Sequence, residues 1–241
     1  MSLRPRTTPF ILLGLLVVAA DPPTTQKVVA QTAKAGKATT QKVVVKVQKV
    51  AFDFVDMWKG DSNSLVATAV GGAEGTRTPD GGKTRAYYGH SDPGNGVWNR
   101  GSFSYQHCDS GCSPEEADRR QLARLKGQYQ VIQRKAAARN LTLNVKTALN
   151  GIDLANQSPL AALDSGGYIE RLAEAYRQGL TGEAAINQAR SLSYISPHTG
   201  NLNAPGLGNS MSRVRADQQR RSDRISDALA SRKLKGTEKP K

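Results

Sequence analysis

Several residue types that mark particular protein classes are scarce in this sequence. Two cysteines and three histidines among 241 residues leave little material for a zinc site, which takes four ligands. Aromatic residues make up 5% of the chain and hydrophobic residues 38%, so we expect a core smaller than the chain, with unpacked ends. Acidic residues number 20 against 34 lysines and arginines, which gives a formal net charge of +14. This surplus predicts an anionic partner, either nucleic acid or a cell-wall polymer.

Long hydrophobic runs are scarce as well, and the clearest one occupies residues 10–20. It is too short to span a bilayer comfortably, and Arg4 and Arg6 precede it. With Ala20 before Asp21 as a cleavage point, the pattern predicts a signal peptide at residues 1–20; an uncleaved anchor is the alternative. Export to the periplasm or the exterior favours a wall polymer over nucleic acid, and no nucleic-acid-binding signature appears.

Polar, basic segments flank the expected folded domain, residues 51–209. Residues 21–50 are rich in Thr, Gln, Lys and Val, and the sequence Thr-Thr-Gln-Lys-Val-Val occurs at residues 24–29 and again at 39–44. We expect a flexible basic linker there, with a wall-adhering arm as the alternative. Residues 210–241 alternate Arg, Asp, Gln and Ser with few apolar positions, which predicts a basic polar tail, either a solvated helix or disordered.

Within the expected domain, helical patterns dominate. The small apolar residues of 64–74 recur at helical spacing, and Gly75 is typical of the residue just past a helix C-terminus. Ser113 followed by Pro114 and Glu116 predicts a second helix start, with a capping box. Further patterns predict helices at residues 141–156, 167–179 and 182–192. Turn formers in residues 76–107 predict a small antiparallel sheet or ordered loop, with 83–89 extended. The expected fold class is α+β, predominantly helical.

Glu74, at the expected helix end, is the candidate catalytic residue. We expect an apolar wall on one side of its carboxyl and an open polar loop on the other. Such surroundings raise the pKa of a glutamate and favour a general acid near neutral pH. An ordinary surface acid is the alternative. Asp80 and Asp92 are candidates for a second carboxylate, as a glycosidase would use, although both also suit simple turns.

The loop after Glu74 is rich in aromatic and amide side chains, the mixture that sugar-binding clefts use. Our candidates for substrate contacts are Tyr87, Tyr88, His90 and Gln106. The tyrosines could alternatively pack the sheet onto the helices. Cys108 and Cys112 are four residues apart and, in an exported chain, predict a local disulfide. We expect no metal and no cofactor.

A family resemblance rests on residues 69–76, Ala-Val-Gly-Gly-Ala-Glu-Gly-Thr. This stretch resembles the catalytic helix end of lysozyme-superfamily enzymes and is most similar to the phage lambda-type endolysins, whose apolar helix ends in a Ser-Glu-Gly-Thr-like motif. Here Ala73 precedes the acid, and residues 85–89 supply a similar Tyr- and Gly-containing loop. The resemblance implies a mostly helical body, a small sheet and Glu74 as general acid. It covers about a dozen residues.

The sequence therefore predicts an exported, lysozyme-like enzyme that cleaves the glycan strands of peptidoglycan. Some members of the superfamily are lytic transglycosylases that need no second acid, so hydrolysis and transglycosylation both stay open. The rival expectation, from a different class, is a non-catalytic exported protein on the same fold that binds the wall polysaccharide.

Overall fold

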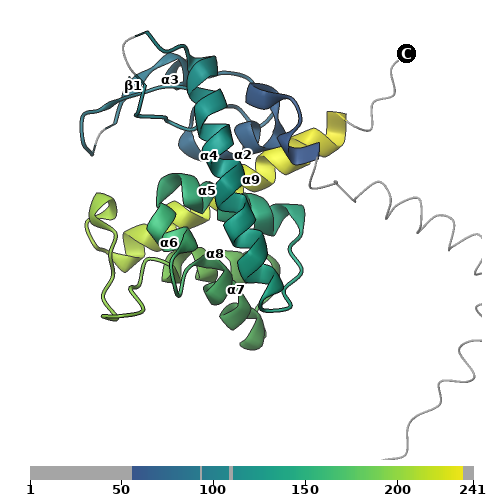
Figure 1. The fold of residues 1–241 in the computed structure, drawn as a ribbon, viewed down its shortest axis with the longest axis vertical. Coiled ribbons are helices and arrows are strands. Elements are labelled where there is room, and N and C mark those ends of the chain that lie inside the picture. The colour runs from purple at the N-terminus through teal and green to yellow at the C-terminus, as the bar shows by residue number, and fades with distance from the viewer. Residues whose placement is uncertain (1–55, 93, 109–110, 236–241) are drawn as a thin grey trace, which may run out of the picture. The chain divides into compact units, whose positions relative to one another are not determined.

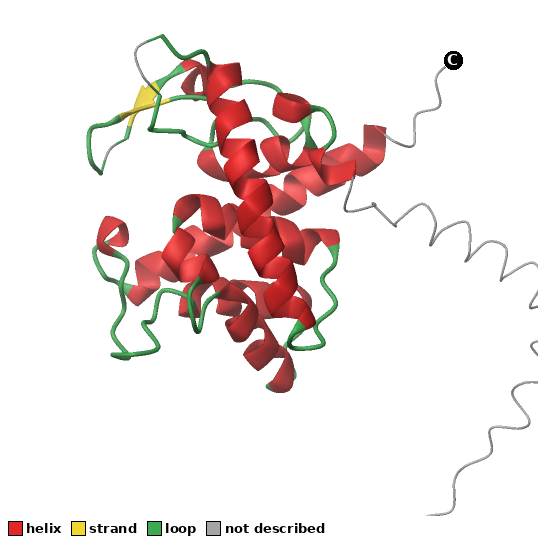
Figure 2. Cartoon of the chain, in the orientation of Figure 1, coloured by secondary structure: helices red, strands yellow, loops and turns green. Residues whose placement is uncertain are grey.

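A computed structural model describes residues 56–92, 94–108 and 111–235, and helices form most of these described residues (Figure 2). These residues fall within one compact unit, Phe52–Lys241. The predicted signal peptide and linker lie outside the described residues. In the described part of the chain, the only sheet has two antiparallel strands. The predicted class, α+β and predominantly helical, is confirmed at this level.

Helix α2 (Leu65–Glu74) is the apolar helix that the sequence predicts. The Ser64 side chain caps its start by accepting a hydrogen bond from the Ala67 amide, 3.2 Å away. Gly75 ends it in a left-handed conformation (φ 79°), which glycine adopts without a steric penalty. Every residue from Leu65 to Ala73 is buried, so α2 lies inside the molecule with only its last side chain reaching solvent.

Helix α4 (Pro114–Ala137) begins as predicted, with the Ser113 hydroxyl accepting from the Glu116 amide and Pro114 in the first turn. It runs from the region of α3 (Arg85–Tyr88) and β1 (His90–Ser91) to that of α7 (Tyr168–Arg177) (Figure 1). The remaining helices after it, apart from the last, are α5 (Val145–Gln157), α6 (Pro159–Leu163), α7 (Tyr168–Arg177) and α8 (Gly182–Leu192). Short 3₁₀ helices are η1 (Asp56–Trp58), η2 (Asp61–Asn63) and η3 (Pro205–Leu207).

Residues 210–241, predicted to be either a solvated helix or disordered, do contain a helix, but this helix is packed against others and not solvated. Met211–Lys235 forms α9, a 25-residue helix that packs along α2, α8 and α5. Its inward face buries the apolar residues Val214, Ile225 and Ala228. It also buries Gln218 and Arg221, whose polar groups bond to side chains of other helices. Polar residues thus occupy core positions, and this is why the helix lacks a clear apolar stripe in the sequence.

The small sheet pairs β1 (His90–Ser91) with β2 (Trp98–Asn99), with His90 opposite Asn99 and Ser91 opposite Trp98. Residues 85–88, expected to be extended, form the short helix α3 (Arg85–Tyr88) instead. Cys108 and Cys112 form the predicted disulfide, with Cα atoms 5.5 Å apart. None of the described helices combines the length and apolar character needed to cross a membrane.

Candidate functional site

Glu74 ends α2 at the edge of the helical core, and its side chain is 15% exposed. Both of its hydrogen-bond donors reach Oε1. Asn156 Nδ2, near the end of α5, lies 3.0 Å away, and Arg221 Nη2, in the middle of α9, lies 2.5 Å away. Three helices therefore meet at this carboxylate. The apolar wall that the sequence predicts is absent, because a guanidinium and an amide occupy that side.

The carboxylate of Glu74 lines a cavity of about 640 Å³. One wall is the segment 92–106, which includes the turn of the small sheet, and the opposite wall is the loop 203–207 (Figure 1). The end of α5 and the first half of α9, through Asp217 and Arg221, complete the lining. The lining is rich in amide side chains, from Asn95, Asn99, Gln106, Asn156, Gln157 and Asn203.

A row of paired, buried charged side chains extends from Glu74 into the core. Arg221 pairs with Asp153 of α5 through two bonds, Nη2–Oδ1 of 2.7 Å and Nε–Oδ2 of 3.0 Å. Arg190 of α8 reaches the same carboxylate, with Nη2 2.6 Å from Oδ2. With Glu74 ionised, the two acids and two arginines balance in charge. Glu74 and Arg221 are the members of this group that line the cavity.

The charge states of Asp153 and Arg221 follow from burial and from their charged neighbours. Burial raises the pKa of Asp153, but attraction to Arg221 and Arg190 outweighs burial and holds the pKa below its ordinary value. Burial likewise lowers the pKa of Arg221, yet the nearby carboxylates of Asp153 and Glu74 raise it above its ordinary value. Both groups are therefore charged at neutral pH.

The two candidates for a second carboxylate lie in different places. Asp92 lines the cavity with Glu74, and its Oδ1 also accepts the amides of Gly94 (2.7 Å) and Asn95 (3.1 Å), as a turn-forming aspartate does. Asp80 is outside the cavity lining, and its Oδ1 accepts a bond from the Thr78 hydroxyl within a turn.

Of the four predicted substrate contacts, only Gln106 is among the cavity-lining residues. Tyr87 is fully buried, so it does not line the cleft. Its hydroxyl donates to Glu115 Oε1 (3.0 Å), and the cationic groups of Arg77 and Lys83 lie 4.6 and 4.5 Å from its ring centroid.

Tyr88 and His90 lie outside the cavity lining as well. Tyr88 is 62% exposed, and it follows Tyr87 on α3, where the two rings meet edge to face. The Nδ1 atom of His90 is 2.9 Å from the Ala86 carbonyl, which anchors β1 to α3. Tyr87 thus has the packing role that was the alternative for the tyrosines.

The polar residues of the site that sequence reasoning missed include Asn156, Tyr194, Asp217 and Arg221. Asp217 Oδ2 accepts from Gln157 (2.8 Å), and its Oδ1 pairs with Arg220. Burial raises the pKa of Tyr194 to about 12, so its phenol keeps its proton at neutral pH. No local motif marks these residues, because they meet Glu74 only through long-range packing.

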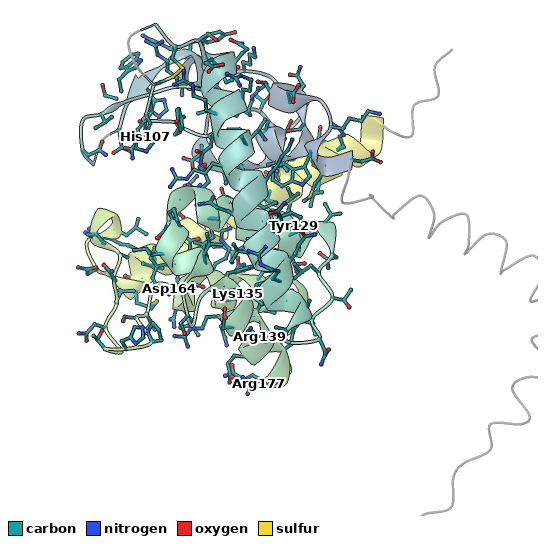
Figure 3. The ribbon with its side chains drawn as sticks, viewed as in Figure 1. His107, Tyr129, Lys135, Arg139, Asp164 and Arg177 are labelled. Carbon is teal, nitrogen blue, oxygen red and sulfur yellow. A yellow bond between two sulfur atoms is a disulfide. The ribbon has the colours of Figure 1, made fainter. Side chains whose placement is uncertain are left out.

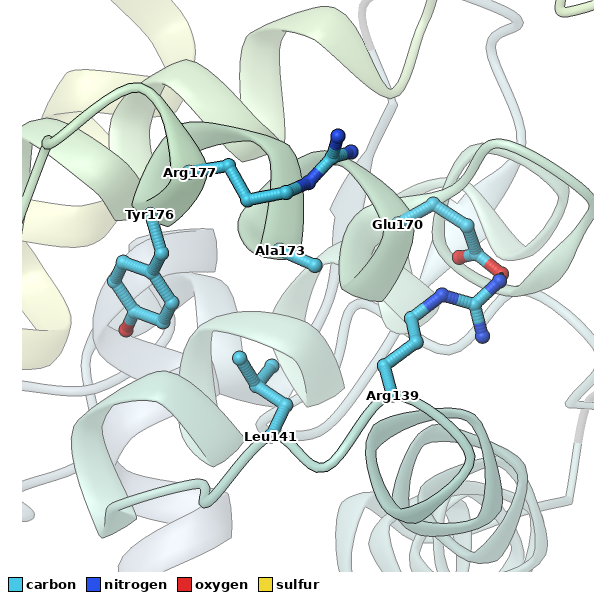
Figure 4. Close-up of a pocket in the computed structure, with 6 residues that line it drawn as sticks. All are labelled: Arg139, Leu141, Glu170, Ala173, Tyr176 and Arg177. Carbon is cyan, nitrogen blue, oxygen red and sulfur yellow. The ribbon is translucent and has the colours of Figure 1, made fainter. Parts of the chain in front are cut away.

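A second cavity, of about 600 Å³, lies between the end of α4 and α7 (Figure 4). Arg139 and Arg177 border it, and Leu141, Ala173 and Tyr176 supply apolar surface. Its one lining carboxylate, Glu170, pairs with Arg139 (2.9 Å) and with Lys135 (3.1 Å), which also binds the Asp164 carbonyl (Figure 3). None of the predicted site residues lines this cavity.

In the part of the chain that the structure describes, no group of three or more His, Cys, Asp or Glu side chains is arranged to hold a metal ion. The polar side chains that line the candidate site are carboxylates, amides, two serine hydroxyls, one phenol and one guanidinium. Comparison with known proteins found no matching family model, no matching curated protein and no matching solved structure.

Proposed function

We propose that the chain is an exported enzyme of the lysozyme type that cleaves the glycan strands of peptidoglycan at the Glu74 cavity. The observation that carries the proposal is the position of Glu74. It is the last side chain of a buried helix, and Arg221 donates a hydrogen bond to its Oε1. The carboxylate also lines a polar cavity that is large enough for sugar rings. The family resemblance of residues 69–76 supports the same assignment.

The cavity lining supports a carbohydrate ligand. Its amide side chains can both donate to and accept from sugar hydroxyls, and Phe103 offers an apolar surface. Asn99 Oδ1 is buried at the cavity and has no hydrogen-bond partner among the described residues. A buried acceptor without a partner is costly, and a ligand hydroxyl would satisfy it.

In the proposed reaction, protonated Glu74 delivers its proton to the bridging oxygen of the glycosidic bond. The carboxylate that forms is stabilised where it lies, because Arg221 and Asn156 already donate to Oε1. Oε2 has no bond to another described residue and is the oxygen available to substrate. Hydrolysis would use a second carboxylate as base or nucleophile, and Asp92 and Asp217 are the candidates because both line the cavity. Transglycosylation needs neither.

The test is release of muropeptides from purified peptidoglycan, analysed by mass spectrometry. Glu74→Gln should lower the rate by about 10²-fold or more, because it removes the transferable proton. Asp80→Asn is the matched control, since it removes a carboxylate outside the cavity, and it should leave the rate unchanged. Anhydro ends on the products indicate transglycosylation, and reducing ends indicate hydrolysis. Full activity in folded Glu74→Gln would exclude the proposed mechanism.

The second candidate is a wall-binding protein without turnover. The ion pair between Glu74 and Arg221 favours it, because the same contact would serve to tie α2 to α9. In that case the wild-type chain retains binding to peptidoglycan but releases no fragments, and Glu74→Gln lowers stability. In either case the positive charge would add attraction to an anionic wall.

A further inference from the structure

The lining of the Glu74 cavity is acidic, in contrast to the chain as a whole. The carboxylates of Glu74, Asp92 and Asp217 line it, and Arg221 is the one cationic side chain among the described residues that do so. The whole chain carries a formal net charge of +14. Distant exposed charges are screened over about 8 Å in physiological salt, so the lining groups dominate the field on a bound ligand.

Two of the three carboxylates have cationic partners. Arg221 donates to Glu74, and Arg220 pairs with Asp217 at 2.8 Å. Among the described residues, Asp92 is the lining carboxylate without such a partner, because its contacts are the backbone amides of its own turn. The negative charge of Asp92 is therefore the one that a cationic group of a ligand can match.

One oxygen of Asp92 remains available to a ligand. Oδ1 accepts the amides of Gly94 and Asn95, which fixes the side chain in the turn. Oδ2 accepts no hydrogen bond from a described residue. The residue is half-buried and lines the cavity, so the orientation of this oxygen is set before a ligand binds.

Asn99 supplies a second acceptor on the same face of the hairpin. Its side chain is 4% exposed, and Oδ1 has no partner among the described residues. Asn99 lies opposite His90 on the small sheet, and Asp92 follows His90 by two residues, where its amide donates to the Val97 carbonyl (2.8 Å). Opposite residues and residues two apart share one face of a sheet, and Asp92 and Asn99 both line the cavity.

We propose that Asp92, with Asn99, binds a protonated amino group of the substrate, so that the cavity selects glycan strands whose amino groups are free over acetylated ones. The inference rests on the proposed function and names its substrate class. An ammonium group has three donors and no acceptor, which matches two acceptors without donors. Its bond to a carboxylate is charge-assisted, whereas an acetamide offers one neutral donor. Asp217 then remains as the lining carboxylate for hydrolysis.

The experiment compares two peptidoglycan glycan oligomers of equal length, one N-acetylated and one N-deacetylated. For the wild type, kcat/KM measured by fragment release should be about tenfold higher for the deacetylated oligomer. Asp92→Asn should bring this ratio close to one. Asparagine also forms such turns, so the change removes the charge and keeps the fold of the loop. Asp80→Asn, outside the cavity lining, is the matched control and should keep the wild-type ratio.

The ratio separates substrate selection from catalysis. If Asp92 were instead the second catalytic carboxylate, Asp92→Asn would slow both substrates and leave their ratio unchanged, which would overturn the inference. Binding provides a readout without cleavage. In the Glu74→Gln background, calorimetric dissociation constants should show the same preference for the deacetylated oligomer, and the preference should shrink at high salt because it depends on charge.

Further outcomes would overturn the inference while sparing the proposed function. A wild type that cleaves both oligomers equally well, or prefers the acetylated one, has no ammonium site. A preference that survives Asp92→Asn does not come from this carboxylate. Conversely, a wild type that binds the deacetylated oligomer more tightly through Asp92 but cleaves neither would uphold the ammonium site and exclude the enzymatic function. A chain that neither binds nor cleaves either oligomer would overturn both.

Discussion

Asp153 is the residue on which the orientation of Glu74 depends. It is completely buried between Arg190 and Arg221, and both guanidinium groups donate to its carboxylate. Arg221 then uses the same Nη2 atom to reach Glu74. Removing the central carboxylate would leave two buried arginines with less than their full complement of negative charge.

At this scale we predict that Asp153→Asn lowers the free energy of unfolding by about 3–5 kcal/mol, as expected when one partner of a buried ion pair is removed. The measurement is urea denaturation at pH 7. Glu174→Gln is the control, because it breaks the surface pair with Arg177 and should cost less than about 1 kcal/mol. A loss below 1 kcal/mol for Asp153→Asn would contradict the prediction.

The destabilisation caused by Asp153→Asn should depend on pH. The pKa of Asp153 is lower in the folded protein than its ordinary value of about 3.9. The stabilisation from its ionised form is therefore complete above that value and is lost as pH falls through the lower, folded-state pKa. The stability difference between wild type and Asp153→Asn should narrow below about pH 4. A difference that stays constant down to pH 2 would argue against this origin.

Only part of the candidate site could be predicted from individual residues. Glu74 carries a local signal, a buried helix followed by glycine, and Asp92 and Gln106 belong to a loop with a recognisable composition. Arg221 and Asn156 carry no such signal. Arg221 lies 147 positions from Glu74 in the chain, and its burial is compatible with its charge only because Asp153 and Glu74 pair with it.

At the scale of elements, α2 depends on its two adjacent glycines in different ways. A Cβ atom at Gly71 would lie 2.4 Å from Arg77 Cγ. Arg77 cannot easily move, because its guanidinium donates to Ser102 Oγ (2.9 Å) and to the Gly81 carbonyl (3.0 Å). Gly71→Ala should therefore destabilise the protein by about 1–3 kcal/mol, the usual cost of overpacking.

Gly72 provides the matched comparison on the same helix. A Cβ atom there would lie 3.7 Å from the Arg224 carbonyl oxygen of α9, which is ordinary van der Waals contact. Gly72→Ala should be neutral or stabilising by up to about 1 kcal/mol, because alanine favours the helix. Thermal unfolding of both variants tests the pair. Equal effects at the two positions would contradict the packing of α2 described here.

Helices whose ends are marked by local capping residues could be predicted from the sequence. Helix positions that depend on contacts with residues far away in the chain could not. The predicted range 182–192 coincides with α8, and Ser113 caps α4 as predicted. Helix α5 begins at Val145 instead of 141, because Asn144 and Thr147 form a capping box there. The packing of α9 escaped prediction because Gln218, Arg221 and Ser222 fill buried positions that an isolated sequence pattern assigns to solvent.

For the whole molecule, the net charge of +14 sets the expected response to salt. Arginines at positions 124, 134, 213 and 215 are exposed. We predict that retention on peptidoglycan sacculi falls between roughly 0.1 M and 1 M salt, as the Debye length shortens from about 10 Å to about 3 Å. Co-sedimentation measures it. Retention that is insensitive to salt would contradict the charge argument.

The meeting of α2, α5 and α9 at Glu74 has a consequence for biosynthesis. A ribosome makes Glu74 early and Arg221 147 positions later, so a growing chain holds the acid long before its guanidinium partner exists. A growing or truncated chain that lacks α9 keeps Asn156 as a donor to this carboxylate but has no Arg221, and the α9 side of the cavity is missing. Such a chain would carry the acid without the guanidinium that helps to orient it.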